Sequence, residues 1–248
     1  MMIRLDKYLA DMGLGTRQEV KKKIRKGMVL VNQETIKSPD CKIREGVDLV
    51  SVEGRIISYV AYEYYMLNKP AGVVSATEDS RNQTVVDLLQ TKRRKDLFPV
   101  GRLDKDTEGL LLITNDGGLA HRLLAPRRHV DKTYYAEIQG CVTKEDVRLF
   151  REGIDIGTDG REELTMPAIL ELITSGEESK VRLTIQEGKY HQVKRMFEAL
   201  GKEVTYLKRE RMGPLTLDEN LKTGEYRQLT DEELEGLKEL ENVGDKNA

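Results

Sequence analysis

The sequence predicts an α+β protein, with a mostly antiparallel mixed sheet and flanking helices after a small helix-helix-strand domain. Strand patterns and helix patterns are intermingled along the chain without a regular strand-helix-strand repeat, which argues against a parallel α/β sheet. The 248 residues are 38% hydrophobic, enough to bury a substantial core in one or two domains. We expect two domains, at residues 1–60 and 61–240, and an acidic tail at 241–248.

The first domain begins with two short helices. Apolar residues at helical spacing predict the first helix, at Leu5, Tyr8, Leu9 and Met12. Gly13-Leu14-Gly15 ends this helix, and Thr16-Arg17-Gln18-Glu19 has the pattern of a capping box that starts a second one. Val20 and Ile24 lie on the interior face of the second helix. Met28–Gln33 then predicts a strand and a turn.

The charges of the chain are unevenly distributed, although its net charge is only −2. Residues 1–30 carry eight Lys or Arg and three Asp or Glu, a net +5, whereas residues 215–248 carry four and ten, a net −6. The second helix holds most of the basic charge, at Arg17, Lys21, Lys22, Lys23, Arg25 and Lys26. A local basic patch, rather than the overall charge, neutralises phosphates and releases counterions. An ordinary solvated helix face is the alternative interpretation.

The second domain begins near residues 58–64, where one strand-rich stretch ends and another starts. Asn68-Lys69-Pro70-Ala71-Gly72 predicts a turn that opens it. Apolar or alternating runs predict strands at 110–114, 133–138, 181–185 and 204–207. Helical patterns predict helices at 84–90, 143–151, 192–200 and 231–240.

Residues 101–118 combine an acidic loop with an apolar run. Leu110–Thr114 is too short and too unbroken for an amphipathic helix, and turn residues flank it, so we predict a buried strand. Asp104 and Asp106 then lie in the loop that leads into this strand. Loops on a rigid scaffold commonly carry catalytic side chains, and a carboxylate beside the basic Arg102 stays ionised near neutral pH. Asp104 is therefore the leading candidate for a nucleophile.

Two other interpretations of this loop remain open. The stretch Asp104–Gly109 mimics the first six positions of a calcium-binding EF-hand, but the twelfth position is Asn115 instead of a bidentate Glu. Asp104 and Asp106 also form a conceivable glycosidase pair. Two residues of one loop are an unusual source for such a pair.

No metal site and no disulfide framework is expected. Cys41 and Cys141 are isolated, without a Cys or His at zinc spacing, and we expect both to be small buried hydrophobic residues. His121, His129 and His191 lack the spacing of helix ligands. The chain has no long apolar run and no apolar signal core at its start. We therefore expect a cytoplasmic protein without a membrane partner.

Three sequence blocks, in this order, resemble those of RNA pseudouridine synthases: Gly101-Arg102-Leu103-Asp104, then Arg127–Tyr134, then Glu187–Phe197. With the N-terminal domain, the resemblance covers nearly the whole chain. It implies the same fold as above and an RNA-modifying isomerase. In that reaction the C1′–N1 bond of a flipped-out uridine is broken and the uracil is rejoined through C5, so no cofactor is implied.

The resemblance also implies roles for single residues. Asp104 would start the cleavage, by attack at C6, by attack at C1′ or by abstraction of a ribose proton, and the sequence leaves these open. Tyr134 would stack on the uracil and manage the proton released from C5. Lys194 would be the basic partner of Asp104, at a position where many relatives carry an arginine whose bidentate clamp is lost here. Substrate binding is assigned to Arg102, His191 and Gln192.

The N-terminal domain resembles the RNA-binding module named after small-subunit ribosomal protein four. This resemblance favours phosphate contact by the second helix over a merely solvated face. The residues expected to contact RNA are Arg17, Lys21, Lys22, Arg25 and Lys26.

Within the family, Tyr190-His191-Gln192 and the segment Leu207–Leu215 resemble the ribosomal small subunit pseudouridine synthase A group. Large-subunit relatives usually show Asn-Arg-Gln at the first of these positions. The expected substrate is one uridine of bacterial 16S ribosomal RNA, in free RNA or in a small-subunit assembly intermediate, and the expected form is a monomer. The same reaction on 23S ribosomal RNA, or a non-catalytic RNA-binding assembly factor, is the alternative.

Overall fold

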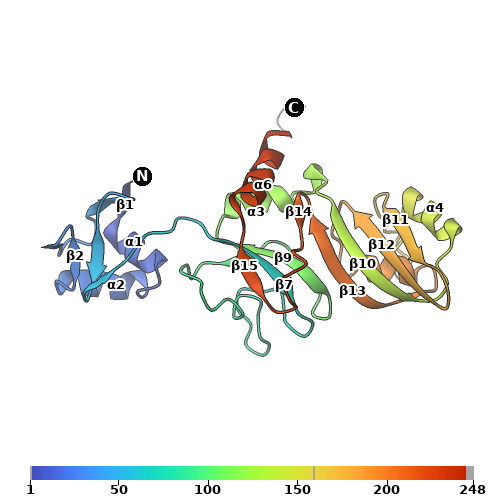
Figure 1. Cartoon of the computed structure of the whole chain (residues 1–248), viewed down its shortest axis with the longest axis horizontal. Helices are drawn as coiled ribbons and strands as arrows, with labels where there is room; N and C mark the ends of the chain where they lie inside the picture. The colour runs from blue at the N-terminus through green and yellow to red at the C-terminus, as the bar shows by residue number, and fades with distance from the viewer. Residues whose placement is uncertain (1, 159, 244–248) are drawn as a thin grey trace. The chain divides into compact units, whose positions relative to one another are not determined.

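The computed structural model describes residues 2–158 and 160–243 and divides into two compact units (Figure 1). The N-terminal unit contains the chain up to Glu63 together with Gln90–Leu97, and the larger unit contains Tyr64–Leu89 and the chain from Phe98 onward. Of the expected acidic tail, residues 241–243 complete the last helix and residues 244–248 lie outside the described residues.

The predicted helix pair of the N-terminal unit is confirmed as α1 (Leu5–Asp11) and α2 (Arg17–Arg25). The capping box of α2 is present, because the Glu19 amide donates to Thr16 Oγ1 at 3.3 Å and the Thr16 amide donates to Glu19 Oε2 at 2.7 Å. The apolar faces of both helices are buried together with the strands of this unit.

Short strands complete the N-terminal unit. Its four-stranded sheet has the order β3-β2-β5-β6, and a separate pair joins β1 to β4. Their bounds are β1 Met2–Arg4, β2 Val29–Val31, β3 Glu34–Thr35, β4 Lys42–Arg44, β5 Val50–Val52 and β6 Arg55–Ile56. The strand predicted within Met28–Gln33 is β2, and Asn32 and Gln33 form the turn after it with positive φ angles.

The segment Gln90–Leu97 completes the N-terminal unit around Arg94, which is buried. Its Nη1 lies 3.3 Å from Asp11 Oδ2, and its guanidinium lies 5.7 Å from the centre of the Tyr59 ring. The backbone amides of Arg93 and Arg94 both donate to the buried carboxylate of Glu63. These contacts join two stretches of chain that lie far apart in the sequence.

The larger unit is built on a mixed sheet in which every pair is antiparallel except β9 with β13 (Figure 1). The main path of the sheet is β11-β12-β10-β13-β9-β7-β15, with β14 paired to β13 and β8 paired to β9. The bounds are β7 Tyr64–Lys69, β8 Phe98–Pro99, β9 Glu108–Thr114, β10 Lys132–Gln139, β11 Ile169–Thr174, β12 Glu178–Ile185, β13 Glu203–Met212, β14 Leu215–Thr216 and β15 Tyr226–Gln228. The predicted α+β class and mostly antiparallel sheet are confirmed.

Four α-helices pack on this sheet: α3 Gly117–Leu124, α4 Lys144–Glu152, α5 Gln192–Glu198 and α6 Asp231–Val243. A short 3-10 turn, η1, covers Pro126–Arg128. Helices α3 and α6 lie side by side over the core around β9 and β14 (Figure 1). Helices α4 and α5 meet through Phe150 and Phe197, whose ring centres are 4.9 Å apart. The helices predicted at 143–151, 192–200 and 231–240 are confirmed.

Strand β9 lies in the middle of the sheet, as its unbroken apolar sequence predicts, and Gly109–Thr114 are all buried. Gly109 lies where β9 pairs in parallel with β13, opposite Arg209, and has a φ of 100°. A Cβ atom at this position would overlap the Arg209 backbone, so only glycine permits this close approach.

Two expectations about local structure are wrong. Residues 84–90 form successive turns instead of a helix, because the backbone of Val85 pairs with Val74 and both valines of this segment are buried. The cysteines are not buried, since Cys141 is exposed in the turn between β10 and α4 and Cys41 is partly exposed.

Candidate active site

The Asp104 loop is held by a lysine that the sequence analysis did not single out. Lys69, at the end of β7, is fully buried, and its Nζ donates to the carbonyl oxygens of Pro70 at 3.0 Å, Asp104 at 3.0 Å, Lys105 at 3.2 Å and Thr107 at 2.8 Å. Burial lowers the pKa of Lys69 to about 8, against the opposing charges of nearby carboxylates. One side chain thus fixes the backbone of the whole acidic loop.

Three further hydrogen bonds fix the other side of the loop. Ser75 Oγ donates to the Leu103 carbonyl at 2.8 Å and accepts from the Leu103 amide at 3.1 Å. The Gly72 amide donates to the Lys105 carbonyl at 2.7 Å. Lys69 and the turn at Ala71 and Gly72 therefore support the loop that carries Asp104, whereas Asn68 and Lys69, which were predicted to lie in this turn, belong to β7.

Asp104 lines a pocket of about 80 Å³ between this loop, β10 and the start of α5. Its polar lining includes the predicted site residues Arg102, Asp104, Tyr134, His191 and Gln192. Its apolar lining comes from Leu103, Ile185, Val193 and Leu207. A mixed lining of this kind, with a carboxylate among apolar walls, suits a small planar group with polar edges.

Asp104 lies among basic side chains. Its Oδ1 is 3.5 Å from His191 Nε2, and its Oδ2 is 3.7 Å from Lys194 Nζ. Lys194 is closer to Asp106, with 2.7 Å from Nζ to each carboxylate oxygen. This hydrogen bond to Lys194 lowers the pKa of Asp106. Lys194 therefore neutralises two carboxylates and makes its direct hydrogen bonds to Asp106 only.

Tyr134 reaches the pocket from β10 and is buried. Its neighbours across the sheet are Leu183 on β12 and Arg209 on β13. Tyr135 points to the other face, as strand alternation predicts, and its hydroxyl donates to Glu137 Oε1 at 2.8 Å. The Tyr134 ring is thus held by the sheet at the pocket wall.

Thr107 is another pocket residue that the sequence analysis missed. It is buried, and its Oγ1 has no hydrogen-bond partner among the described residues. The short acidic loop offers no sequence signal for this arrangement.

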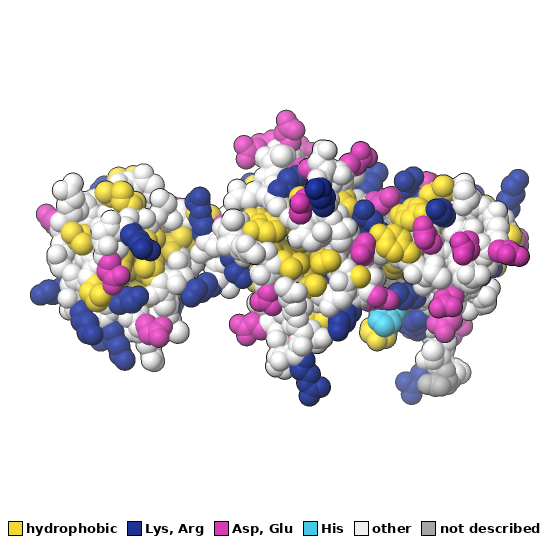
Figure 2. Space-filling view, turned by 60° about the horizontal axis from the view of Figure 1, so that its bottom comes forward, with side chains coloured by type: hydrophobic (Ala, Val, Ile, Leu, Met, Phe, Trp, Pro, Cys, Tyr) yellow, Lys and Arg dark blue, Asp and Glu magenta, His cyan; other side chains and the backbone are white. Residues whose placement is uncertain are grey.

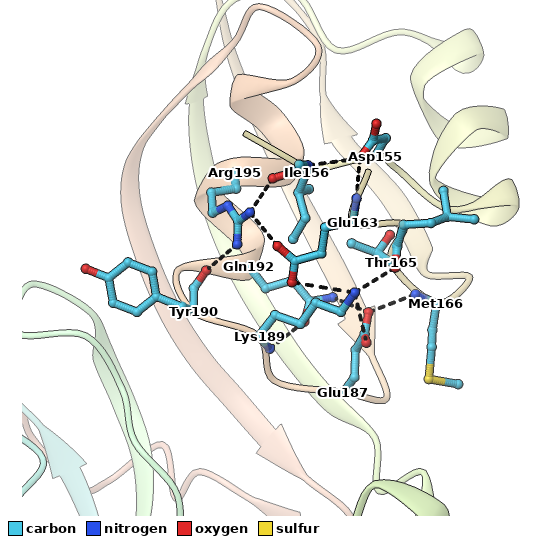
Figure 3. A network of polar contacts seen from close by, with 12 residues as sticks. Asp155, Ile156, Glu163, Thr165, Met166, Glu187, Lys189, Tyr190, Gln192 and Arg195 are labelled. Carbon is cyan, nitrogen blue, oxygen red and sulfur yellow. Dashed lines mark hydrogen bonds and ion pairs between the residues drawn. The ribbon is translucent and has the colours of Figure 1, made fainter. Parts of the chain in front are cut away.

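The block that begins α5 is braced by a polar network (Figure 3). Gln192 is buried, accepts at Oε1 from the Lys189 amide at 2.9 Å and donates from Nε2 to Glu187 Oε1 at 2.9 Å. Glu187 Oε1 also accepts from the Met166 amide at 2.8 Å. The amide of Gln192 is therefore engaged inside the protein, and this residue shapes the loop at 187–191.

A basic pair extends the same network toward the segment before β11 (Figure 3). Arg195 pairs with Glu163 Oε2 at 2.6 Å and donates to the Tyr190 carbonyl at 3.2 Å. Lys189 Nζ donates to the Leu164 carbonyl at 2.6 Å. These bonds tie the loop at 187–191 to residues 156–166.

The basic residues predicted on the second helix lie on α2 in the N-terminal unit, from which several Lys and Arg side chains project (Figure 2). Arg17, Lys22, Arg25 and Lys26 are exposed. Lys21 is partly engaged, because its Nζ lies 3.6 Å from the buried carboxylate of Asp6. The exposed four are the ones available to a phosphate backbone.

Two negative findings concern the residues that the structure describes. Within residues 2–158 and 160–243, no group of three or more His, Cys, Asp or Glu is arranged to hold a metal ion. Over the same residues, no helix combines the length and apolar character needed to cross a membrane.

Comparison with known proteins places this geometry in a family. The family model for RNA pseudouridylate synthase matches residues 63–199, and the model for the S4 domain matches residues 3–49. A crystal structure of a pseudouridylate synthase superimposes with a TM-score of 0.66 and is 39% identical in sequence, covering 95% of this chain and 99% of that one.

Curated relatives match over nearly their full length. An uncharacterized RNA pseudouridine synthase, YtzG, of Bacillus subtilis is 49% identical over 96% of this chain and 99% of its own. Ribosomal small subunit pseudouridine synthase A of Vibrio cholerae is 45% identical, over 95% and 99%, and that of Escherichia coli K12 is 40% identical, over 94% and 98%. With its acidic loop, its pocket and these matches, the chain belongs to the RNA pseudouridylate synthase family and carries an S4 domain at its N-terminal end.

Proposed function

We propose that this enzyme converts one uridine of bacterial 16S ribosomal RNA to pseudouridine, and that Asp104 starts the reaction. The observation that carries the proposal is the position of Asp104 in a pocket that also holds Tyr134, with His191 and Lys194 within 3.7 Å of its carboxylate. Full-length relatives named ribosomal small subunit pseudouridine synthase A support the choice of substrate.

The proposed chemistry divides among the pocket residues. The Asp104 carboxylate, with basic side chains around it, opens the C1′–N1 bond, and the uracil turns and rejoins the ribose through C5. The Tyr134 ring stacks on the uracil, and its hydroxyl manages the proton that C5 releases. The isomerisation balances, because a C1′–C5 bond replaces the C1′–N1 bond and the proton lost from C5 is offset by the proton gained at N1.

The residues around Asp104 place positive charge beside it and hold the substrate. Lys194 acts mainly as a point charge, because its hydrogen bonds go to Asp106. Arg102, exposed at the pocket rim, contacts the RNA backbone next to the flipped nucleotide. Gln192 acts through the loop that it supports.

The S4 domain supplies the second contact with RNA. Its exposed basic side chains on α2 bind phosphates without reading sequence. Bacterial ribosomal RNA as substrate places the enzyme in the cytoplasm. The enzyme is proposed to act as a monomer.

The catalytic assignment is tested with the Asp104→Asn variant. The wild type is expected to release tritium from 16S transcript labelled at uridine C5. In this variant the release should fall below detection, by at least about 1000-fold, because the amide is neither nucleophile nor base. Asp231→Asn makes the same change at an exposed position in α6 and should react like the wild type. Equal release by Asp104→Asn and the wild type, with RNA binding intact, would leave a non-catalytic assembly factor as the better account.

The substrate assignment needs a separate measurement. Pseudouridine mapping of 16S and 23S ribosomal RNA from a strain that lacks this protein should show one site lost in 16S. Complementation with the wild type should restore that site, and complementation with Asp104→Asn should not. Loss of a 23S site instead would retain the reaction and reject the small-subunit substrate.

A further inference from the structure

Among the residues that the structure describes, Tyr190 has the most exposed large hydrophobic side chain, at 71%. Its ring stacks on the His191 ring with 3.8 Å between centroids and 18° between planes. One face of the tyrosine is thus covered by the imidazole, and the other faces solvent. A single exposed aromatic ring is common on protein surfaces, so its support and its position decide whether it has a role.

The backbone under this pair is held in a defined conformation by hydrogen bonds. His191 adopts a left-handed conformation with a φ of 48°, which is uncommon for a residue other than glycine. Arg195 holds the Tyr190 carbonyl from Nη1 while its Nη2 pairs with Glu163. In Figure 3 the Tyr190 ring extends away from this network, so the network fixes the backbone and leaves the ring exposed.

The pair stands next to the reaction site. His191 lines the pocket, and its Nε2 lies 3.5 Å from Asp104 Oδ1. Tyr190 is not part of the lining, so its ring lies on the outer side of the imidazole. A planar group just outside the pocket could therefore stack on the Tyr190 ring.

We propose that the stacked pair Tyr190–His191 is a platform for the nucleobase adjacent to the target uridine. The proposal rests on the function proposed above and specifies that the enzyme acts on a uridine in a single-stranded segment of RNA. Flipping a uridine out of a strand costs its stacking with the neighbouring base. Tyr190 gives that neighbour a new stacking partner, and aromatic stacking accepts any base because every base has a π face.

The test uses two single-stranded oligoribonucleotides with one uridine each, carrying 2-aminopurine on the 5′ side in one and on the 3′ side in the other. Wild-type protein is expected to quench the fluorescence of one of them. Tyr190→Leu should lose the quenching and bind that RNA about tenfold more weakly, which corresponds to about 1.4 kcal/mol. Tyr190→Phe keeps the ring and should bind within about twofold of the wild type.

An abasic nucleotide at the quenched position separates stacking from any structural effect. Without the base, wild type and Tyr190→Leu should bind equally, because the contact is already missing. Tyr62→Leu removes another tyrosine, 55% exposed and in the N-terminal unit, and should leave binding and quenching unchanged. The thermal midpoint of Tyr190→Leu should match that of the wild type.

Three results would overturn the platform: quenching of neither RNA by the wild type, equal binding of base-containing RNA by wild type and Tyr190→Leu, or an equal loss on abasic RNA. Failure of the proposed function has a different signature. In that case the wild type forms no pseudouridine in 16S ribosomal RNA, whatever the oligonucleotides show.

Discussion

Lys69 shows how a single buried cation can position a catalytic loop without touching the substrate. Its Nζ contacts four carbonyl oxygens, three of them within Asp104–Thr107. The sequence predicts a turn at this place but not the burial, since lysine is among the residues least often buried. A buried lysine has no sequence signature, because its partners here are backbone groups that every residue carries.

Replacement of Lys69 by Met should destabilise the protein by roughly 2–4 kcal/mol, because several buried carbonyl groups lose their donor. The difference from the wild type should widen as the pH rises from 8 toward 10.5, the ordinary pKa of lysine. The folded chain releases the Lys69 proton near pH 8, whereas the unfolded chain keeps it until about pH 10.5. The unfolded state then holds more protons, so the contribution of Lys69 to stability rises with pH.

Urea unfolding of both proteins at pH 7, 8, 9 and 10 measures this effect. Lys105→Met serves as the matched control, since Lys105 is exposed in the same loop and donates only to Asn82 Oδ1. A pH-independent gap between wild type and Lys69→Met would mean that Lys69 stays protonated in the folded state.

At Asp104 the sequence predicts more than at Lys69. An acidic loop before an apolar strand led to the residue that lines the pocket. The hydrogen-bond partner of Lys194 could not be predicted from the sequence. Asp104 and Asp106 are two residues apart, so the sequence does not say which of them lies closer to Lys194. In the structure Lys194 Nζ is 3.7 Å from the Asp104 carboxylate and 2.7 Å from that of Asp106.

At the scale of the element, α2 illustrates what periodicity can and cannot predict. Its capping box and its buried face, Val20 and Ile24, follow from spacing alone. Which lysines are engaged does not follow, because it depends on α1 and the segment after it: Lys21 approaches Asp6 of α1, and Lys23 donates to the Leu14 carbonyl at 2.9 Å. Burial raises the pKa of Asp6, but hydrogen bonds and charge from Arg4, with a contribution from Lys21, outweigh it and keep the pKa low.

The triple variant Lys22→Ala, Arg25→Ala, Lys26→Ala should therefore weaken RNA binding and flatten its salt dependence. Each phosphate contact contributes about 0.7 to the slope of log K against log salt for a single strand, so loss of three contacts should lower the slope by about 2. Filter binding at several salt concentrations gives the slope.

The matched control removes three exposed charges of the same unit that lie outside α2: Lys37→Ala, Lys42→Ala, Arg55→Ala. Its slope should stay close to that of the wild type. If both triple variants flatten the slope equally, RNA senses the charge of the unit and not a site on α2.

The sequence also predicted strand β9, because an apolar run bounded by turn residues has few other solutions. The helix expected at 84–90 failed because its apolar residues serve a turn whose backbone pairs with Val74. Strand β11 was not recognised at all, since most of its residues are exposed and it lies at an edge of the sheet. The spacing of apolar residues does not predict an element correctly when the element does not bury one continuous face.

At the scale of the whole molecule, the chain leaves the larger unit at Gln90 and returns at Phe98. In between, Arg94 pairs with Asp11 and Asp96 and stacks on Tyr59. No local pattern predicts this excursion, because Asp11 and Tyr59, its partners in the rest of the N-terminal unit, lie more than thirty residues away in sequence.

Arg94→Met should destabilise the N-terminal unit by roughly 3 kcal/mol, because the carboxylate of Asp11, which also accepts from the Tyr59 hydroxyl at 2.8 Å, loses its cationic partner in a largely buried site. Hydrogen exchange should then accelerate in α1 and α2 and stay unchanged in β9 and β10. Arg93→Met is the control, since that side chain is exposed and only its backbone amide contacts Glu63. Uniformly faster exchange in both units would show that Arg94 supports the entire fold.

The excursion at Gln90–Leu97 also limits how this protein can be shortened or recombined. A fragment that begins at residue 61 would keep Arg94 but lack Asp11 and Tyr59. The Arg94 guanidinium would then lose an ion-pair partner and an aromatic contact. A variant in which the RNA-binding domain is removed or replaced would therefore also need changes in the eight residues Gln90–Leu97. The two units are therefore expected to need redesign together rather than separately.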